Sequence, residues 1–234
     1  MSPNDHVRTF YLDGKPITAR GDETILDVAQ QNGVFIPTLC HFNGLPDVGS
    51  CRMCLVEVKG FPRPVPACAT RISEGMQVTT QSELLTELRK TVLELLFAEG
   101  NHICAVCVSN GHCELQFLAQ KLGLDHLSMS YRYPSRVVDS SHPRFNLDRN
   151  RCILCTRCVR VCEEVEHAKC WDVAGRGISA GVITDLNLGW GDTTFCTGCG
   201  KCVQVCPTGA LSVKGNAVGE MVKHPRPIQQ AAAR

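Results

Sequence analysis

Two runs of cysteines with identical spacing carry the clearest chemistry in this sequence. Each run reads C-x₂-C-x₂-C-x₃-C: the first is Cys152, Cys155, Cys158 and Cys162, and the second is Cys196, Cys199, Cys202 and Cys206, followed by Pro207. Where this spacing binds two [4Fe-4S] clusters, three cysteines of a run bind one cluster and the fourth binds the other. We therefore expect one site of Cys152, Cys155, Cys158 and Cys206, and another of Cys196, Cys199, Cys202 and Cys162.

Zinc is the alternative occupant of cysteine pairs. A structural zinc ion needs four ligands, which two C-x₂-C pairs supply, so it gains nothing from the further cysteines of each run. The spacing of both runs therefore favours iron-sulfur clusters and predicts electron transfer.

A third group of cysteines lies nearer the N-terminus, with ten, two and thirteen residues between successive members: Cys40, Cys51, Cys54 and Cys68. The C-x₄-C-x₂-C…C pattern of plant-type [2Fe-2S] sites has the same close pair and distant fourth cysteine, but a shorter first interval. Gly44, Gly49 and Ser50 make the intervening loop flexible enough to turn backbone N–H groups toward sulfur. We expect a [2Fe-2S] cluster here, with zinc as the alternative.

A fourth group has only three cysteines, spaced C-x₂-C-x₅-C: Cys104, Cys107 and Cys113. Because a cubane cluster takes four ligands, one more group is needed, and His102 stands two residues before the first cysteine. His112 is the rival within the loop, but binding through it would strain the backbone. We expect His102 to complete a third [4Fe-4S] site.

The ligand count agrees with this assignment. One [2Fe-2S] and three [4Fe-4S] clusters need about sixteen ligands, and the sixteen cysteines without Cys170, plus one histidine, supply that number. Cys170 stands beside Trp171 outside every motif, and we interpret it as a buried free thiol. If Cys170 were a ligand instead, His102 would be an ordinary polar residue.

The polarity and charge of the sequence limit the location and the partners that we expect for this protein. The first residues are polar, without the apolar run of a signal peptide, and no apolar stretch in the 234 residues has membrane-spanning length. We expect a cytoplasmic protein whose thiols hold metal, without membrane insertion. The formal charge is +1, but fifteen thiolates around four cluster cores would bring it to roughly −6, so a nucleic-acid partner is not expected.

Local patterns predict the N-terminal elements. Alternating residues around Asp13-Gly14 predict a hairpin over residues 7–19. Thr24 and Asp27 form a capping-box pattern for a short helix that ends at Gly33. Strands are expected over residues 55–58 and 76–79, with Pro62, Pro64 and Pro66 excluding regular structure between them.

The remaining sequence predicts shorter elements around the cysteines. A long helix should run from Ser82 to Gly100, with an apolar stripe formed by Leu85, Leu88, Val92, Leu95 and Leu96. A shorter helix is expected over residues 114–122, and residues 125–146 have no clear period. Residues 163–194 form an insertion between the two runs, expected to be a small hairpin that covers a cluster or meets a partner.

These patterns predict an α+β protein of three parts. Residues 1–80 would form a β-grasp [2Fe-2S] ferredoxin-like domain, and residues 81–125 a small helical His-Cys₃ [4Fe-4S] domain. Residues 126–215 would form a ferredoxin-like domain of the bacterial type that binds two [4Fe-4S] clusters, interrupted by the insertion. The tail, residues 216–234, is expected to be weakly structured.

The order of these parts resembles the iron-sulfur region shared by the NADH dehydrogenase large subunit and iron-only hydrogenases. Segments I-P-T-L-C-H (36–41), E-G-N-H (99–102) and R-C-I-L-C-T-R-C-V-R-V-C (151–162) resemble most the diaphorase small subunits of bidirectional, NAD(P)-linked nickel-iron hydrogenases. The resemblance covers about residues 7–215. The chain departs from the wider family in having H-x-C before Cys104 rather than H-x₃-C, and Glu163 where the second run has Pro207.

The resemblance implies a non-catalytic subunit of an oxidoreductase complex. It would relay single electrons between a flavoprotein subunit that binds FMN and NAD(P)H and the small and large subunits of a nickel-iron hydrogenase, within a hetero-oligomer. The sequence itself contains no G-x-G-x-x-G fingerprint placed between a strand and a helix. Two alternatives stay open: an iron-sulfur subunit of a formate dehydrogenase or NADH dehydrogenase complex, and a zinc-stabilised assembly module.

Overall fold

The computed structural model describes residues 7–222, so residues 223–234 of the expected C-terminal tail lie outside it. The backbone divides into two compact units. The N-terminal unit contains residues up to His41 together with Asp47–Val92, and the C-terminal unit contains Phe42–Pro46 and the chain from Leu93 onward.

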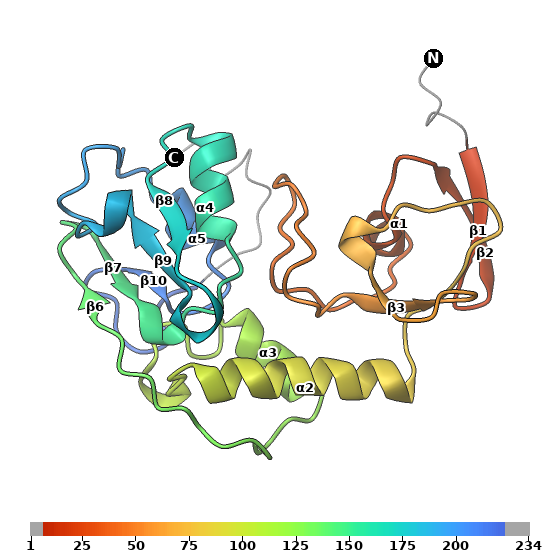
Figure 1. Cartoon of the computed structure of the whole chain (residues 1–234), viewed down its shortest axis with the longest axis horizontal. Helices are drawn as coiled ribbons and strands as arrows, with labels where there is room; N and C mark the ends of the chain where they lie inside the picture. Colours follow the sequence, from red (N-terminus) through yellow and green to blue (C-terminus); the bar gives the residue numbers. More distant parts are fainter. Residues whose placement is uncertain (1–6, 223–234) are drawn as a thin grey trace. The chain divides into compact units, whose positions relative to one another are not determined.

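The N-terminal unit is built on a five-stranded sheet with strand order β2-β1-β5-β3-β4. Figure 1 labels β1, β2 and β3 of this sheet. Strands β1 (Val7–Leu12) and β2 (Lys15–Arg20) form the predicted hairpin. Asp13 and Gly14 at its turn both have left-handed backbone angles (φ 50° and 79°), as a two-residue type I′ hairpin turn requires. Strand β1 also pairs in parallel with β5 (Gln77–Thr79), which gives the β-grasp layout expected from the sequence.

Helix α1 (Ile25–Gln31) begins with the predicted capping box. The Thr24 Oγ1 accepts a hydrogen bond from the Asp27 N–H at 3.2 Å, and an Asp27 carboxylate oxygen accepts one from the Thr24 N–H at 2.9 Å. The helix buries Ile25, Leu26 and Val28 in the core of this unit. Burial of each such side chain stabilises the fold by about 1.5–3 kcal/mol.

The segment between the central strands differs from the prediction. Strand β3 (Leu55–Val58) pairs with a two-residue strand, β4 (Val65–Pro66), although Pro66 was expected to exclude regular structure. Proline is tolerated because β4 is an edge strand, where no further partner requires its missing N–H. A short 3₁₀ turn, η1 (Ala67–Ala69), follows and carries Cys68.

Helix α2 (Glu83–Glu99) is the predicted long helix, and the boundary between the two units falls within it. The Ser82 hydroxyl accepts a hydrogen bond from the Leu85 N–H at 3.2 Å, which confirms the predicted cap. The predicted apolar stripe is wrong at one position: Leu95 is 51% exposed, whereas Leu93 is fully buried. Leu95 lies at one edge of the stripe and Leu93 lies beyond its opposite edge, and only the Leu93 side is covered.

The C-terminal unit frames its cysteine runs with a three-stranded sheet of order β10-β7-β6. Strand β7 (Phe145–Asp148) precedes the first run and pairs with β10 (Leu211–Val213), which follows the second. Strand β6 (Val138–Asp139) and the start of β7 lie in the stretch for which the sequence showed no period, because elements this short have no detectable periodicity.

Short helices and helical turns lie next to the cysteines of this unit in the sequence, and Figure 1 labels α3, α4 and α5 among them. They are η2 (Cys104–Val106), α3 (Glu114–Lys121), η3 (Arg149–Arg151), α4 (Arg157–Arg160), the π-helical turn η4 (Val161–Val165) and α5 (Lys201–Val205). The insertion forms the predicted hairpin, with strands β8 (Trp171–Ala174) and β9 (Gly181–Thr184). Two 3₁₀ turns accompany the hairpin, η5 (Gly177–Ser179) and η6 (Asp185–Asn187).

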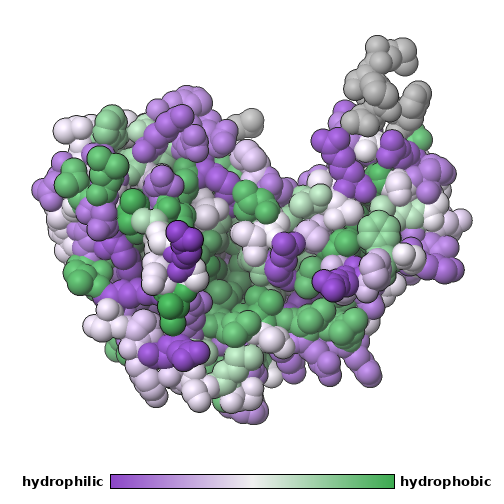
Figure 2. Space-filling view, in the orientation of Figure 1, coloured by the Kyte–Doolittle hydropathy of each residue, from purple (hydrophilic) through white to green (hydrophobic). Residues whose placement is uncertain are grey.

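Two further observations concern the polarity of the surface and of the helices. On the face drawn in Figure 2, hydrophilic and hydrophobic side chains are interspersed, in line with 24 basic and 23 acidic residues in the sequence. Among the described helices, none combines the length and apolar character needed to cross a membrane.

Candidate metal centres

The two cysteine runs share a left-handed backbone conformation at two equivalent positions. Leu154 and Thr156 in the first run have left-handed backbone angles (φ 51° and 57°), as do Gly198 and Gly200 at the equivalent positions of the second (φ 67° and 77°). Left-handed residues turn successive backbone N–H groups inward, which makes a concave loop suited to an anionic group. In the first run, the Leu154 N–H donates to the Cys152 sulfur at 3.5 Å.

The second-run site, defined as Cys162, Cys196, Cys199 and Cys202, surrounds a cavity. Cys162 comes from the first run, so the chain brings the fourth cysteine of that run across to the first three of the second. Phe145, Trp171 and Trp190 line the same cavity. This is the crossed arrangement that the spacing predicts for a pair of [4Fe-4S] sites.

The first-run site, defined as Cys152, Cys155, Cys158 and Cys206, is the reciprocal group. Burial, with a smaller contribution from the Cys206 thiolate, raises the pKa of Cys152 to about 11 and that of Cys155 to about 12. Cys155, Cys158 and Cys206 are each no more than 8% exposed. Three buried thiols and the half-buried Cys152 thiol are costly to ionise in one place unless a cation compensates them, which is what iron would supply.

The N-terminal site, defined as Cys40, Cys51, Cys54 and Cys68, lies wholly within the N-terminal unit. The Cys54 and Cys68 sulfurs lie 3.4 Å apart, and the hydrogen bond between them lowers the pKa of Cys54 to about 7. Hydrogen bonds from Cys51 and Cys68 lower the pKa of Cys40. The close C-x₂-C pair and the distant cysteines are therefore brought together despite the long first interval.

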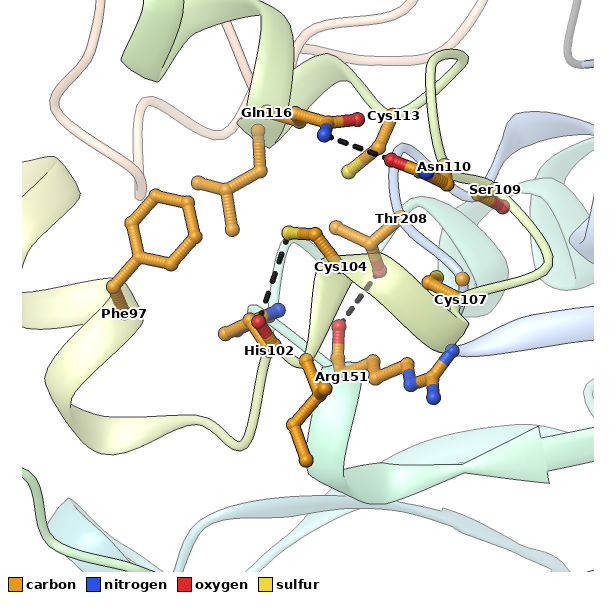
Figure 3. Close-up of a pocket in the computed structure, with 13 residues that line it drawn as sticks. Phe97, His102, Cys104, Cys107, Ser109, Asn110, Cys113, Gln116, Arg151 and Thr208 are labelled. Atoms are coloured by element: carbon orange, nitrogen blue, oxygen red, sulfur yellow. Dashed lines mark hydrogen bonds between the residues drawn. The ribbon is translucent and has the colours of Figure 1, made fainter. Parts of the chain in front are cut away.

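The His-Cys site, defined as His102, Cys104, Cys107 and Cys113, surrounds a second cavity (Figure 3). The His102 Nε2 is buried and has no hydrogen-bond partner among residues 7–222. Burial, followed by the nearby Arg151 cation, lowers the pKa of His102 to about 4, so the imidazole is neutral at pH 7. A neutral imidazole nitrogen is the form that binds metal. His112, the rival, is exposed and does not line the cavity.

Gly209 lines this cavity and Gly100 lies beside the His102 ring, and neither position was predicted from the sequence. A Cβ atom on Gly209 would lie 2.5 Å from the Cys107 sulfur, and one on Gly100 would lie 2.3 Å from the His102 Nε2. Gly209 follows the second cysteine run closely, so the wall of the His-Cys site is built from the end of that run. A glycine where backbone and ligand side chain approach closely is the signal that could have indicated this role.

The donor sets fit iron-sulfur clusters. All sixteen cysteines lie within residues 7–222 and none of them forms a disulfide. In the same part of the chain, no three His, Cys, Asp or Glu side chains converge closely enough to hold a metal ion between them. A cubane differs from a single ion because each thiolate binds a different iron at its own corner. Thiols spaced around the cavities of the second-run and His-Cys sites match that requirement.

Three residues near the second-run site interact with its sulfurs and were not predicted to do so from the sequence: Cys170, Trp190 and Gly198. Cys170 is buried, as predicted, and its N–H donates to the Cys162 sulfur at 3.4 Å. The Trp190 indole N–H donates to the Cys196 sulfur at 3.3 Å. Hydrogen bonds, first from the Cys170 thiol and then from the Gly198 N–H and Trp190, lower the pKa of Cys196 to about 5.

Comparison with known protein families assigns each part of the chain. Residues 6–83 match the family described as "2Fe-2S iron-sulfur cluster binding domain". Residues 89–128 match "NADH-ubiquinone oxidoreductase-G iron-sulfur binding region", and residues 142–212 match "NADH-quinone oxidoreductase subunit 3, ferredoxin-like domain". The matches agree with the expected α+β fold, with a [2Fe-2S] ferredoxin-like part followed by a [4Fe-4S] ferredoxin-like part.

Individual relatives fall into two size classes. The chain is 38% identical to the NADPH-Fe(3+) oxidoreductase subunit alpha of Geobacter sulfurreducens over 87% of its own length, but it spans only 24% of that protein. It is 36% identical to the NAD-reducing hydrogenase HoxS subunit gamma of Cupriavidus necator, over 87% of this chain and 86% of that protein.

A chain in a solved structure has about the same length as this chain, as the HoxS gamma subunit does. A chain in the crystal structure of NAD⁺-reducing [NiFe]-hydrogenase in the H₂-reduced state is 40% identical and matches with a TM-score of 0.84, covering 90% of this chain and 88% of that one. The described fold, the cysteine spacing and the near full-length match to HoxS gamma lead to one assignment. The chain belongs to the family of iron-sulfur electron-transfer subunits that includes the gamma subunit of NAD-reducing hydrogenase.

Proposed function

We propose that this chain relays single electrons through one [2Fe-2S] and three [4Fe-4S] clusters. The N-terminal site would hold the [2Fe-2S] cluster, and the His-Cys, first-run and second-run sites would each hold a [4Fe-4S] cluster. Such clusters supply one-electron transfer at potentials set by the surrounding protein. The proposal keeps the three domains expected from the sequence, which are residues 1–80, 81–125 and 126–215.

The observation that carries the proposal is the exchange of cysteines between the two runs. Cys162 lines the second-run cavity, and Cys206 raises the pKa of Cys152 and Cys155 in the first-run site. Zinc pairs have no need of such an exchange, whereas two neighbouring cubanes use it to share a compact frame. The zinc-stabilised module is therefore the weaker hypothesis.

The protein's own residues contribute burial, spacing and hydrogen bonds to sulfur. The Leu154 N–H donates to the Cys152 sulfur of the first-run site, and the Cys170 N–H donates to the Cys162 sulfur of the second-run site. The buried Arg157, between Cys155 and Cys158, places a fixed positive charge beside the first-run site. These features stabilise the more negative, reduced form of a cluster, which raises its potential.

The proposed partners follow from the relative that the chain nearly spans. The HoxS gamma match supports a place in an NAD(P)-reducing hydrogenase, between a flavoprotein subunit that binds FMN and NAD(P)H and a nickel-iron hydrogenase module. In this proposal the chain itself has no substrate site, since it offers no nucleotide-binding fingerprint, and it works within a hetero-oligomer.

A second candidate function has support of its own. The family descriptions over residues 89–128 and 142–212 name NADH-ubiquinone and NADH-quinone oxidoreductase. In that case the same clusters would connect a flavin site to a quinone-reducing complex, with no nickel enzyme attached. The sites in this chain would be unchanged, so only the partners distinguish the two candidates.

Purification of the native complex separates these candidates. The complex is isolated anaerobically through a tag on this chain, its nickel is counted, and hydrogen-dependent reduction of NAD⁺ and NADP⁺ is assayed. We expect nickel to co-purify and hydrogen to reduce one of the two nucleotides. A nickel-free complex that reduces quinone with NADH would overturn the hydrogenase assignment and favour the second candidate.

A further inference from the structure

The insertion between the two cysteine runs supplies both tryptophans of the chain, Trp171 and Trp190. Both line the cavity of the second-run site and are at most 4% exposed. Two-cluster ferredoxin folds do not need an insertion of this length to place their cysteines. The position of both tryptophans at this cavity therefore suggests a role other than packing within the insertion.

The Trp190 side chain is fixed with its N–H directed at a cysteine sulfur. Its indole Nε1 lies 3.3 Å from the Cys196 sulfur. The ring stacks on Phe145, with centroids 5.4 Å apart, and lies tilted against the His142 ring, with centroids 4.8 Å apart. The Trp190 backbone N–H donates to the Asp139 carboxylate at 2.8 Å. Both the backbone and the ring of Trp190 are held in place, so the hydrogen bond from its indole N–H to the Cys196 sulfur is preorganised.

Trp171 lines the cavity of the second-run site together with Trp190. It packs edge-on against Trp190, with ring centroids 4.8 Å apart. Burial raises the pKa of Cys202, and a hydrogen bond from the Trp171 side chain opposes that increase. Trp171 thus supports the ring of Trp190 and lines the cavity of the second-run site beside it.

We propose that Trp190, assisted by Trp171, raises the reduction potential of the cluster in the second-run site. One-electron reduction adds one negative charge to the cluster and its thiolates, with no proton transferred. An N–H dipole aimed at a ligand sulfur stabilises that added charge more than it stabilises the oxidised form, and burial strengthens the effect. This inference rests on the proposed function, since it requires a cluster at this site.

The first-run site is an internal reference in the same molecule. Because the chain has only two tryptophans and both are at the second-run site, no indole of this chain is available to the first-run sulfurs. Its sulfurs receive backbone donors such as the Leu154 N–H instead. Loss of the Trp190 indole should therefore change one cubane potential and leave the other unchanged.

The test is a redox titration of the full-length chain followed by electron paramagnetic resonance. Cys199→Ser first assigns the signal of the second-run cluster. Trp190→Phe keeps an aromatic ring but removes the donor. We expect the equilibrium constant for reducing this cluster to fall about tenfold, a potential lower by about 59 mV for one electron. The first-run potential should not move.

Val161→Ala is the matched control, because Val161 lines the same cavity and has no side-chain donor. An unchanged potential in Trp190→Phe, or an equal shift in Val161→Ala, would overturn the inference. A chain that binds no iron and sulfide at the second-run site would instead overturn the proposed function, and the two failures are distinguished by metal and sulfide analysis.

A second measurement covers the case in which Trp190→Phe does not fold. The unaltered chain is produced with ¹⁵N in its tryptophan indoles, and pulsed electron paramagnetic resonance is recorded on the reduced second-run cluster. A ¹⁵N coupling to this signal, absent from the first-run signal, is the expected result. The absence of any coupling would overturn the inference without a substitution.

Discussion

Arg157 and Glu114 form an ion pair through two parallel hydrogen bonds, Nη1 to Oε1 at 2.6 Å and Nη2 to Oε2 at 2.7 Å. Arg157 lies between two cysteines of the first run, and Glu114 directly follows Cys113 of the His-Cys site. The Arg157 guanidinium is 2% exposed and also donates to the Val205 carbonyl at 3.2 Å. This pair therefore joins the two cluster-binding segments of the C-terminal unit.

Glu114→Gln should destabilise the C-terminal unit, because it leaves the buried Arg157 charge without its partner. Since Glu114 is 40% exposed, water compensates part of the loss. We expect a cost of about 2 kcal/mol, below the range for a fully buried pair. Loss of cluster absorbance in urea, compared between variant and parent chain, measures it. The control is Glu87→Gln on the exposed side of α2, and equal behaviour of the two variants would contradict the prediction.

Cys51→Ser should abolish the [2Fe-2S] signal and leave the cubane signals in place. The physical reason is that the N-terminal site lies wholly in one compact unit, whereas the other three sites lie in the second unit. Electron paramagnetic resonance of the reduced chain checks this. Simultaneous loss of all signals would mean that the two units do not hold their clusters independently.

His102→Cys should keep the cluster of the His-Cys site but lower its potential. A thiolate brings a negative charge where a neutral imidazole had none, and this charge disfavours the reduced form. A redox titration of the assigned signal measures the change, and a fall of at least about 59 mV, tenfold in the reduction constant, is expected. His112→Cys is the control, since His112 does not line the cavity. If only His112→Cys shifted the potential, the assignment of His102 would be wrong.

Gly209→Ala should weaken cluster binding at the His-Cys site alone. The added Cβ would approach the Cys107 sulfur to 2.5 Å, so the thiol must move away from its place in the cavity. We expect a loss of about four irons per chain, read from metal analysis and from the missing signal. Gly181→Ala, where a Cβ meets nothing within 4 Å, is the control. Full iron content in Gly209→Ala would contradict this account.

Local rules explain which parts of the fold could be predicted. The Asp13-Gly14 turn and the Thr24 cap depend on neighbours within three residues, and both were predicted correctly from the sequence. The cysteine spacing predicted that the fourth member of each run crosses to the other, and the structure does bring Cys162 to the second run. Its role as a ligand stays a prediction.

Contacts between distant residues could not be predicted in the same way. The Arg157–Glu114 pair joins residues 43 positions apart, and its partners are fixed only by tertiary packing. The same holds for Gly209 beside the Cys107 sulfur. The error at Pro66 has a different origin, because proline is excluded from strand interiors but not from an edge, and the sequence did not show that β4 would be the edge.

The central claim is that iron and sulfide occupy the four cysteine groups, and counting both tests it most directly. The full-length chain is prepared anaerobically, and its iron, zinc and acid-labile sulfide are measured per chain. One [2Fe-2S] and three [4Fe-4S] clusters predict about 14 irons and about 14 sulfides with no stoichiometric zinc. A colourless protein with zinc and no sulfide would contradict the account.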